Sequence, residues 1–212
     1  MGKVQTRHAL AGDRMQNVQA SDADRIARLF TRDGRFLCAR WGRPVAPVMF
    51  GLDDATLAVF GSVTRAALAH AGIPLAQTDP QMGANLLGFF VRDWDELPGL
   101  PDLAGLTGRQ GLAERLGASG ADSYRLFRFD ADGGIRACIS LVRIGGGLAQ
   151  AHPAALAEAL VMRALLTFGD EVAPSAWLAG LIRAAYDPVL PVAARDASHA
   201  LRLAARMPAG LR

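Results

Sequence analysis

Residues 135–144 read IRACISLVRI, and residues 156–168 read LAEALVMRALLTF. The first stretch is a mostly apolar run of the length expected for a buried strand, and the second is a longer, mostly apolar run interrupted by Arg163, which predicts a helix. A strand followed by a helix that packs on it is typical of folds in which helices cover a sheet. The predicted helix contains one carboxylate, Glu158, and no histidine.

A β-hairpin is predicted immediately before this helix. Residues 124–129, YRLFRF, alternate apolar and basic side chains with the two-residue period of a strand. The sequence Asp130-Ala-Asp-Gly-Gly134 follows and is rich in turn-forming residues. The run from Ile135 to Ile144 is then the second arm of the hairpin.

The segments upstream add two strands and a helix. Residues 43–50, RPVAPVMF, predict an extended strand whose two prolines favour a sheet edge or the beginning of a strand. Asp53 and Asp54 place negative charge at the start of a helix, which Gly72 ends. Residues 85–91, NLLGFFV, predict a buried strand.

Shorter elements flank this region. A helix is predicted over residues 21–31 and a strand over residues 36–39, and two more helices over residues 175–185 and 196–207. The alternation of strands and helices predicts an α+β fold in which helices pack on a mixed sheet.

Length and composition indicate one globular domain. The chain has 212 residues, 51% of them hydrophobic and 20% charged, which is enough to form a large core. We expect a single α+β domain over residues 21–207, an N-terminal arm over 1–20 and a tail over 208–212. No apolar run approaches the ~20 residues that span a bilayer, and no apolar segment follows the basic N-terminus, so we expect a cytoplasmic protein without a membrane partner.

The net charge of +3 is unevenly distributed. Residues 1–19 carry a net +2 and residues 193–212 a net +3, which leaves −2 for the remainder. A nucleic-acid-binding domain gathers basic residues on one folded surface. The distribution therefore argues against a nucleic-acid partner, and a basic-tailed nucleic-acid accessory protein is kept as an alternative.

The sequence predicts no metal site and no cofactor. No two of the four histidines lie three or four residues apart, and the two cysteines are too distant in sequence for a zinc knuckle. Gly145-Gly146-Gly147 follows a strand but lacks the lysine and hydroxyl residue of a phosphate-binding loop. Cys38 and Cys138 lie in strand-like runs and are interpreted as buried core residues.

Three carboxylates are considered for acid–base chemistry, although the sequence favours no catalytic residue. Asp93 and Glu96 come directly after the strand at 85–91, and Glu158 lies in the long helix. General acid–base catalysis needs such a group to be desolvated. Solvated turns and helix starts explain all three positions equally simply.

Tryptophan and arginine side chains at strand ends are the predicted binding residues. Arg40, Trp41 and Arg43 flank one predicted strand, and Arg92 and Trp94 follow another. Tryptophan and arginine are enriched among the residues that dominate binding energies. The alternative is that each tryptophan packs over its own sheet.

Five segments, taken together, resemble a bacterial family of unknown function whose fold is related to the zinc metallopeptidases. They extend over about residues 40–205 and are RPVAPVMFGLDDATLAVFGSVTRAALAHAGI (43–73), ANLLGFFV (84–91), IRACISLV (135–142), ALAEALVMRALLTFGDE (155–171) and IRAAYDPVLP (182–191).

The resemblance implies that the helix at 156–168 corresponds to the metallopeptidase active-site helix. The nearest match to the HExxH motif is Ala157-Glu158-Ala159-Leu160-Val161, in which only the glutamate agrees. Both zinc-ligand positions are apolar, so no zinc is held and Glu158 has no metal-bound water to activate.

The expected function is therefore that of a non-catalytic binding or scaffold protein on an inactive metallopeptidase-like fold. Its expected partner is a peptide or protein segment added as a strand to an exposed sheet edge, with Ile135–Ile144 as the predicted edge. The alternative is a metal-independent hydrolase or transferase that uses the carboxylates around Asp93–Glu96 or Glu158.

Overall fold

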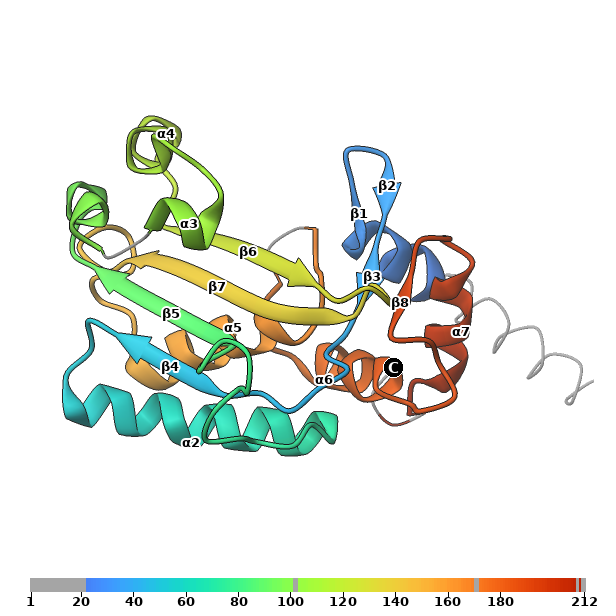
Figure 1. Cartoon of the computed structure of the whole chain (residues 1–212). Coiled ribbons are helices and arrows are strands. Elements are labelled where there is room, and N and C mark those ends of the chain that lie inside the picture. Colours follow the sequence, from blue (N-terminus) through green and yellow to red (C-terminus); the bar gives the residue numbers. More distant parts are fainter. Residues whose placement is uncertain (1–21, 101–102, 170–171, 209, 211–212) are drawn as a thin grey trace, which may run out of the picture. The chain divides into compact units, whose positions relative to one another are not determined.

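The computed structural model describes residues 22–100, 103–169, 172–208 and 210 (Figure 1). The predicted N-terminal arm, residues 1–20, lies outside the described residues. Contacts group the chain into two compact units, one made of the described residues up to Arg40 and from Leu166 onward, and the other of Trp41–Leu165. We call them unit 1 and unit 2; the single domain expected over 21–207 stays a prediction. Within the described ranges, no helix is long and apolar enough to cross a membrane.

Unit 2 is built on a four-stranded mixed sheet. Its strands are β4 (Pro47–Phe50), β5 (Leu86–Val91), β6 (Ser123–Phe129) and β7 (Ile135–Arg143), arranged in the order β4-β5-β7-β6. β4, β5 and β7 are parallel, whereas β6 is antiparallel to β7. The predicted α+β class with a mixed sheet is thus confirmed.

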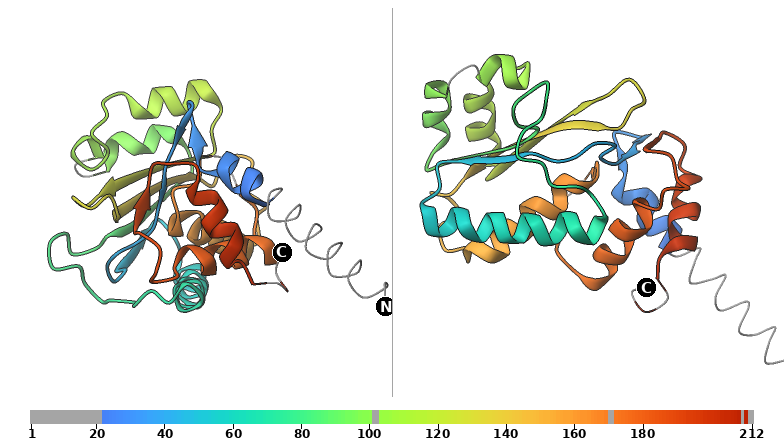
Figure 2. Two further views of the ribbon diagram at one scale, coloured as in Figure 1. Left: turned by 90° about the vertical axis from the view of Figure 1, so that its right-hand side faces the viewer. Right: turned by 60° about the horizontal axis from the view of Figure 1, so that its bottom comes forward.

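Helices cover both faces of this sheet (Figures 1 and 2). α2 (Asp54–Ala71) and α5 (Pro153–Leu165) pack on one face, with Phe60 and Ala157 in a cluster with Phe90 and Val142. The other face carries the 3-10 helix η1 and the short helices α3 and α4, which cover Phe89 and Ile139. Their bounds are Trp94–Gly99, Leu103–Thr107 and Leu112–Ser119.

Local sequence signals set the ends of α2. The Asp53 carboxylate accepts a hydrogen bond from the backbone N–H of Thr56 at 2.9 Å, which satisfies one of the unpaired donors at the helix start. Gly72 ends the helix in the left-handed conformation, with φ of 71°. The helix predicted from Asp53, Asp54 and Gly72 is confirmed.

The β6–β7 hairpin is also confirmed, with strand ends within one residue of those predicted. The Asp130 backbone N–H donates to the Gly134 carbonyl at 2.9 Å and closes the turn. The Asp132 side chain accepts from the Gly134 N–H at 2.9 Å, the kind of local bond that makes aspartate favourable in turns.

The predicted edge position of the strand at 135–144 is wrong. β7 pairs with β5 along one side and with β6 along the other, so it lies inside the sheet. The physical reason is its composition, since a strand covered on both faces is apolar at successive positions and not at alternate ones. Seven of its nine residues are buried.

The long helix begins and ends three residues earlier than predicted, at Pro153–Leu165 in place of 156–168. Leu166 leaves the helix to form an antiparallel bridge with Arg40. The Thr167 hydroxyl accepts from the Ala39 N–H at 2.8 Å and donates to the Leu37 carbonyl at 2.9 Å. α5 therefore ends at Leu165, although the apolar run continues to Phe168, because the residues after Leu165 pair with residues distant in sequence.

Unit 1 consists of short helices and strands from the two ends of the chain, the N-terminal flank up to Arg40 and the C-terminal flank from Leu166 onward. The N-terminal flank has a helix over residues 22–29 and three short strands. One of these strands pairs with a strand of the C-terminal flank, which also contributes two helices. These elements are β1 (Thr31–Arg32), β2 (Arg35–Phe36), β3 (Cys38–Ala39), α6 (Ala176–Ala185), β8 (Ala193–Ala194) and α7 (His199–Arg206).

Candidate functional site

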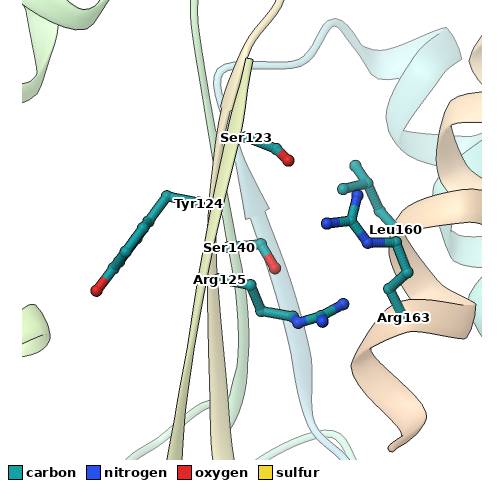
Figure 3. A pocket seen from close by; sticks show the side chains of 6 residues that line it. All are labelled: Ser123, Tyr124, Arg125, Ser140, Leu160 and Arg163. Atoms are coloured by element: carbon teal, nitrogen blue, oxygen red, sulfur yellow. The ribbon is translucent and has the colours of Figure 1, made fainter. Parts of the chain in front are cut away.

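A small polar pocket lies in unit 2 between the β6–β7 hairpin and α5 (Figure 3). The strands contribute the side chains of Ser123, Arg125 and Ser140, and the helix contributes Leu160 and Arg163. The pocket encloses about 190 Å³ including the open space at its mouth. We call it the arginine pocket.

The strand register determines which side chains of the sheet line the arginine pocket. Arg125 lies directly opposite Ser140 in the antiparallel pair, so both side chains point to the same face. Figure 3 shows them directed toward α5, together with Ser123, while Tyr124 points to the opposite face. The two-residue period of the strand thus places Arg125 and the preceding Tyr124 on opposite faces of the sheet.

The apolar stripe of α5 determines which side chains of this helix line the pocket. Ala157, Val161 and Ala164 are fully or almost fully buried against the sheet and recur at helical spacing. Leu160 and Arg163 lie at the border of this stripe, three residues apart and therefore on the same side of the helix. Arg163 is the residue that interrupts the apolar run of this helix.

Two guanidinium groups, those of Arg125 and Arg163, line the pocket beside Cys138. Burial raises the pKa of the neighbouring Cys138 thiol to about 11, although Arg125, a contact with the Ser140 hydroxyl and Arg163 each lower it. The Cys138 side chain is fully buried, and its raised pKa disfavours the reactive thiolate form. Burial also raises the pKa of Cys38, to about 12, in agreement with the core role expected for both cysteines.

The arginine pocket contains the groups that bind an anion and lacks those that perform acid–base chemistry. Arginine offers a planar fork of N–H donors to a carboxylate, and serine hydroxyls add further donors. Among the described residues that line it there is neither a carboxylate nor a histidine. Over the described ranges, no three His, Cys, Asp or Glu side chains are grouped closely enough to hold a metal ion.

A second, apolar pocket adjoins the first and shares Ser140 and Leu160 with it. It lies between the sheet and the helices α2 and α5, where Met49, Gly88 and Val161 belong to its lining. A side chain at Gly88 would meet the Met49 sulfur, since a Cβ built there lies 2.4 Å from it. Glycine in the middle of β5 therefore keeps this space open.

The two predicted binding tryptophans of unit 2 are interior residues. The Trp41 indole N–H donates to the Ala164 carbonyl at 2.8 Å, and the Trp94 indole N–H donates to the Ala121 carbonyl at 2.8 Å. Their side chains are only 3% and 2% exposed. Neither ring is presented to a partner, and the geometry is that of core residues with satisfied donors.

The predicted binding arginines occupy separate positions. Arg43 holds Asp130 through Nη2 at 2.7 Å and Nε at 3.1 Å, and it also contacts Asp79 at 3.4 Å. Arg43 precedes β4 and exposed Arg92 follows β5, so these two lie at opposite ends of parallel strands. In unit 1, Arg40 donates to the Leu190 carbonyl at 3.1 Å.

The three carboxylates are likewise not gathered into one site. Asp93 and Glu96 are exposed at the start of η1, where Glu96 accepts from the Arg92 backbone N–H at 3.4 Å. Glu158 is exposed in the second turn of α5. None of them lines either pocket. Acid–base catalysis by any of the three stays a prediction.

Sequence reasoning missed the arginine pocket, although two of its signals were visible. One signal is Arg125, a basic residue within a predicted strand. The other is Arg163, which interrupts the apolar run of a predicted helix. Their convergence depends on the way α5 returns across the hairpin, which no local pattern encodes. Comparison of the chain with protein-family models, with curated proteins and with solved structures finds no match.

Proposed function

We propose that this protein is a non-catalytic binding protein that takes up an extended peptide segment beside strand β6, on a degenerate metallopeptidase-like fold. The observation that carries the proposal is the position of β6, which is the last strand of the sheet on its side. An outer strand is the place where a peptide joins a sheet by backbone hydrogen bonds. Such binding needs no catalytic group.

Of the two outer strands, β6 is the better suited to strand addition. It has seven residues, none of which is buried, whereas β4 has only four. The approach to β4 is also occupied, because Val45 bonds to Pro74 and Ala76, at 2.9 and 2.8 Å. β6 thus offers the longer and more accessible line of backbone groups.

The ladder geometry directs alternate backbone groups of β6 away from β7. The Arg143 N–H donates to the Asp122 carbonyl at 2.9 Å, which makes these two residues a hydrogen-bonded pair. Such pairs alternate along antiparallel strands, so positions 124, 126 and 128 also bond to β7. The backbone N–H and C=O of Phe127 consequently point outward, toward an added strand.

Two features of α5 support the non-catalytic part of the proposal. Helix α5 follows β7, as the metallopeptidase resemblance leads one to expect, and it carries Glu158 without a histidine. The positions that would hold the zinc ligands, Ala157 and Val161, are buried in the core with 0% and 2% exposure. A binding role is therefore favoured over metal-assisted hydrolysis.

The test uses nuclear magnetic resonance of the ¹⁵N-labelled full chain and a capped peptide that alternates threonine and valine over seven residues, the length of β6. We expect the peptide to shift the Phe127 amide signal and to slow its hydrogen exchange, because that N–H gains an acceptor. The signals of β4 should stay unchanged.

The matched variants are Phe127→Pro and Phe127→Ala. Proline removes only the outward N–H and leaves the ladder to β7 intact, whereas alanine keeps that N–H and loses the same ring. We expect proline to abolish peptide binding and alanine to retain it. Equal binding by the two variants, or protection of β4 in place of β6, would contradict the proposal.

A further inference from the structure

We infer that two copies of this chain pair through strand β6, antiparallel to each other about a two-fold axis at Leu126, and that this pairing closes the edge that a peptide uses. The inference rests on the proposed function, since the same outward backbone groups of β6 serve both partners. It adds a second copy of the chain as the competing partner that regulates access to the edge.

Strand β6 has few of the features that keep outer strands apart. Its seven residues include neither proline nor glycine. Its irregularity lies at one end, between Arg128 and Phe129, so the ladder before it is regular. Outer strands are commonly protected by proline, bulges or charges, and an unprotected one is a template for pairing with another chain. The charges of Arg125 and Arg128 are therefore what a pairing has to accommodate.

The outward backbone groups restrict the register of a β6–β6 pair. Phe127 and every second residue before it direct their N–H and C=O outward, so these residues have to form the hydrogen-bonded pairs. Two identical antiparallel strands are related by a two-fold axis at one residue. An axis at Arg125 would place two guanidinium groups directly opposite each other, which is destabilising. An axis at Phe127 would extend the ladder across the irregularity after Arg128.

An axis at Leu126 instead places each arginine opposite an aromatic ring. Position 125 of one copy faces position 127 of the other, which sets an arginine opposite a phenylalanine. Position 124 faces position 128, which sets a tyrosine opposite an arginine on the other face of the sheet, where Figure 3 shows Tyr124. Arginine is attracted to aromatic faces, and the Arg125 guanidinium already lies 5.3 Å from the Phe127 ring within one chain. The strand is thus complementary to a second copy of itself.

The pairing is open to competition by a peptide. A ladder over positions 124–128 is a small interface of the kind found in transient contacts. The dimer and the peptide complex both use the outward N–H and C=O of Phe127, so each excludes the other. By mass action, a peptide therefore dissociates the dimer, and dimer formation lowers the apparent affinity for the peptide.

Sedimentation of the full chain over a roughly hundredfold range of concentration tests the association. We expect the mean mass to rise from that of one chain toward that of two, and hydrogen exchange of the Phe127 amide to slow in parallel. Phe127→Pro should weaken the association by about tenfold or more, because each copy loses one outward N–H. Arg65→Gln, at an exposed site on α2, is the control and should associate as the unchanged chain does.

Cysteine substitutions test the position of the axis. Leu126→Cys places two thiols in a non-hydrogen-bonded pair whose Cα atoms lie about 4.5 Å apart, within reach of a disulfide. In Tyr124→Cys the two thiols are offset by four residues, roughly 13 Å, which is too far. Under mild oxidation only Leu126→Cys should form a covalent dimer, since the native Cys38 and Cys138 are buried.

A measurement on the unchanged chain covers the case in which a cysteine variant does not fold. In a mixture of ¹⁵N-labelled and ¹³C-labelled copies, magnetisation transfer between the two labels should join Leu126 of one copy to Leu126 of the other. The same signals should disappear when the threonine–valine peptide is added, and the mean mass should fall toward that of one chain.

Each outcome separates the dimer from the proposed function. A single mass at every concentration, with Phe127 still protected by the peptide, would overturn the dimer and leave the proposed function standing. Covalent dimers formed as readily by Tyr124→Cys as by Leu126→Cys would overturn the axis at Leu126. A dimer joined at Leu126 that the peptide neither binds nor dissociates would keep the pairing and overturn the proposed function together with the competition.

Discussion

The indole N–H of Trp41 donates to the main-chain carbonyl of Ala164 at 2.8 Å, and this bond joins the first residue of unit 2 to its last helical turn. The last four carbonyls of a helix have no partner within the helix. Trp41 supplies one from 123 residues away. The residue is buried, and its backbone forms a parallel bridge with Ile135. The same contact therefore caps α5 and closes the unit.

Replacing Trp41 by phenylalanine should destabilise unit 2. The ring is largely preserved, but the Ala164 carbonyl loses its donor in a buried setting, which costs about 1–3 kcal/mol. Urea unfolding followed by circular dichroism measures the change. Trp177→Phe is the comparison, since its indole N–H bonds Asp22 in a partly exposed setting, and it should cost less.

Gly51→Ala should be strongly destabilising, whereas Gly61→Ala should be stabilising. Gly51 has φ of 83°, and a Cβ there would lie 2.0 Å from the Phe90 carbonyl oxygen. Forcing this conformation on alanine costs about 1–3 kcal/mol before the collision is counted. Gly61 lies inside α2 with nothing within 4 Å, so alanine should gain about 0.5–1 kcal/mol. Melting temperatures should move in opposite directions.

Lowering the pH should destabilise unit 1, because His199 is protonated more readily in the unfolded chain than in the folded one. Its side chain is 2% exposed, and burial, followed by the charges of Arg202 and Arg206, lowers its pKa below the ordinary 6.5. The unfolded chain then binds a proton at a higher pH than the folded chain does. The free energy of unfolding should therefore decrease as the pH falls through 6.5 toward the folded pKa.

The measurement compares urea unfolding at about pH 8 and about pH 5, on either side of the ordinary histidine pKa. His199→Phe keeps a buried ring without a titrating group and should lose less stability on acidification. His70→Gln, at an exposed site, should behave as the unchanged protein. An identical pH dependence in all three chains would rule out His199 as the cause.

Glu158→Gln should change little. The structure places Glu158 in the second turn of α5, not the first, and its side chain is exposed. The favourable interaction of a carboxylate with the start of the helix is largely confined to the first turn. We expect the free energy of unfolding to change by less than about 0.5 kcal/mol. Peptide binding at β6 should be unaffected, and loss of a measured enzymatic activity would favour the hydrolase alternative.

Purified protein should contain no stoichiometric zinc. His70 and His152 belong to unit 2 and His199 to unit 1, and no cluster of three ligand side chains occurs over the described ranges. Elemental analysis decides the point. Close to one zinc per chain, removed by a chelator together with the folded structure, would refute the expectation.

Several elements could be predicted because their causes are local. Asp53 and Gly72 set the ends of α2 through hydrogen bonds to residues three or four positions away. The turn from Asp130 to Gly134 closes on itself and fixes the hairpin. Residues 98–111 are rich in glycine and proline, yet α3 forms there. α4 follows, because Leu112 and Leu116 pack on an apolar face of the sheet. That burial overrides weak local preference.

The sequence by itself determined the longer elements, among them α2, β5 and the β6–β7 hairpin, that β7 is apolar enough to be covered, and that α5 has no zinc ligands. These properties depend on side-chain type, spacing and short-range hydrogen bonds. Only the tertiary structure decided that β7 is central, that β6 is an outer strand and that Arg125 meets Arg163 across 38 positions of the chain. Strand order and helix docking are set by the packing of surfaces distant in sequence, which no local pattern specifies.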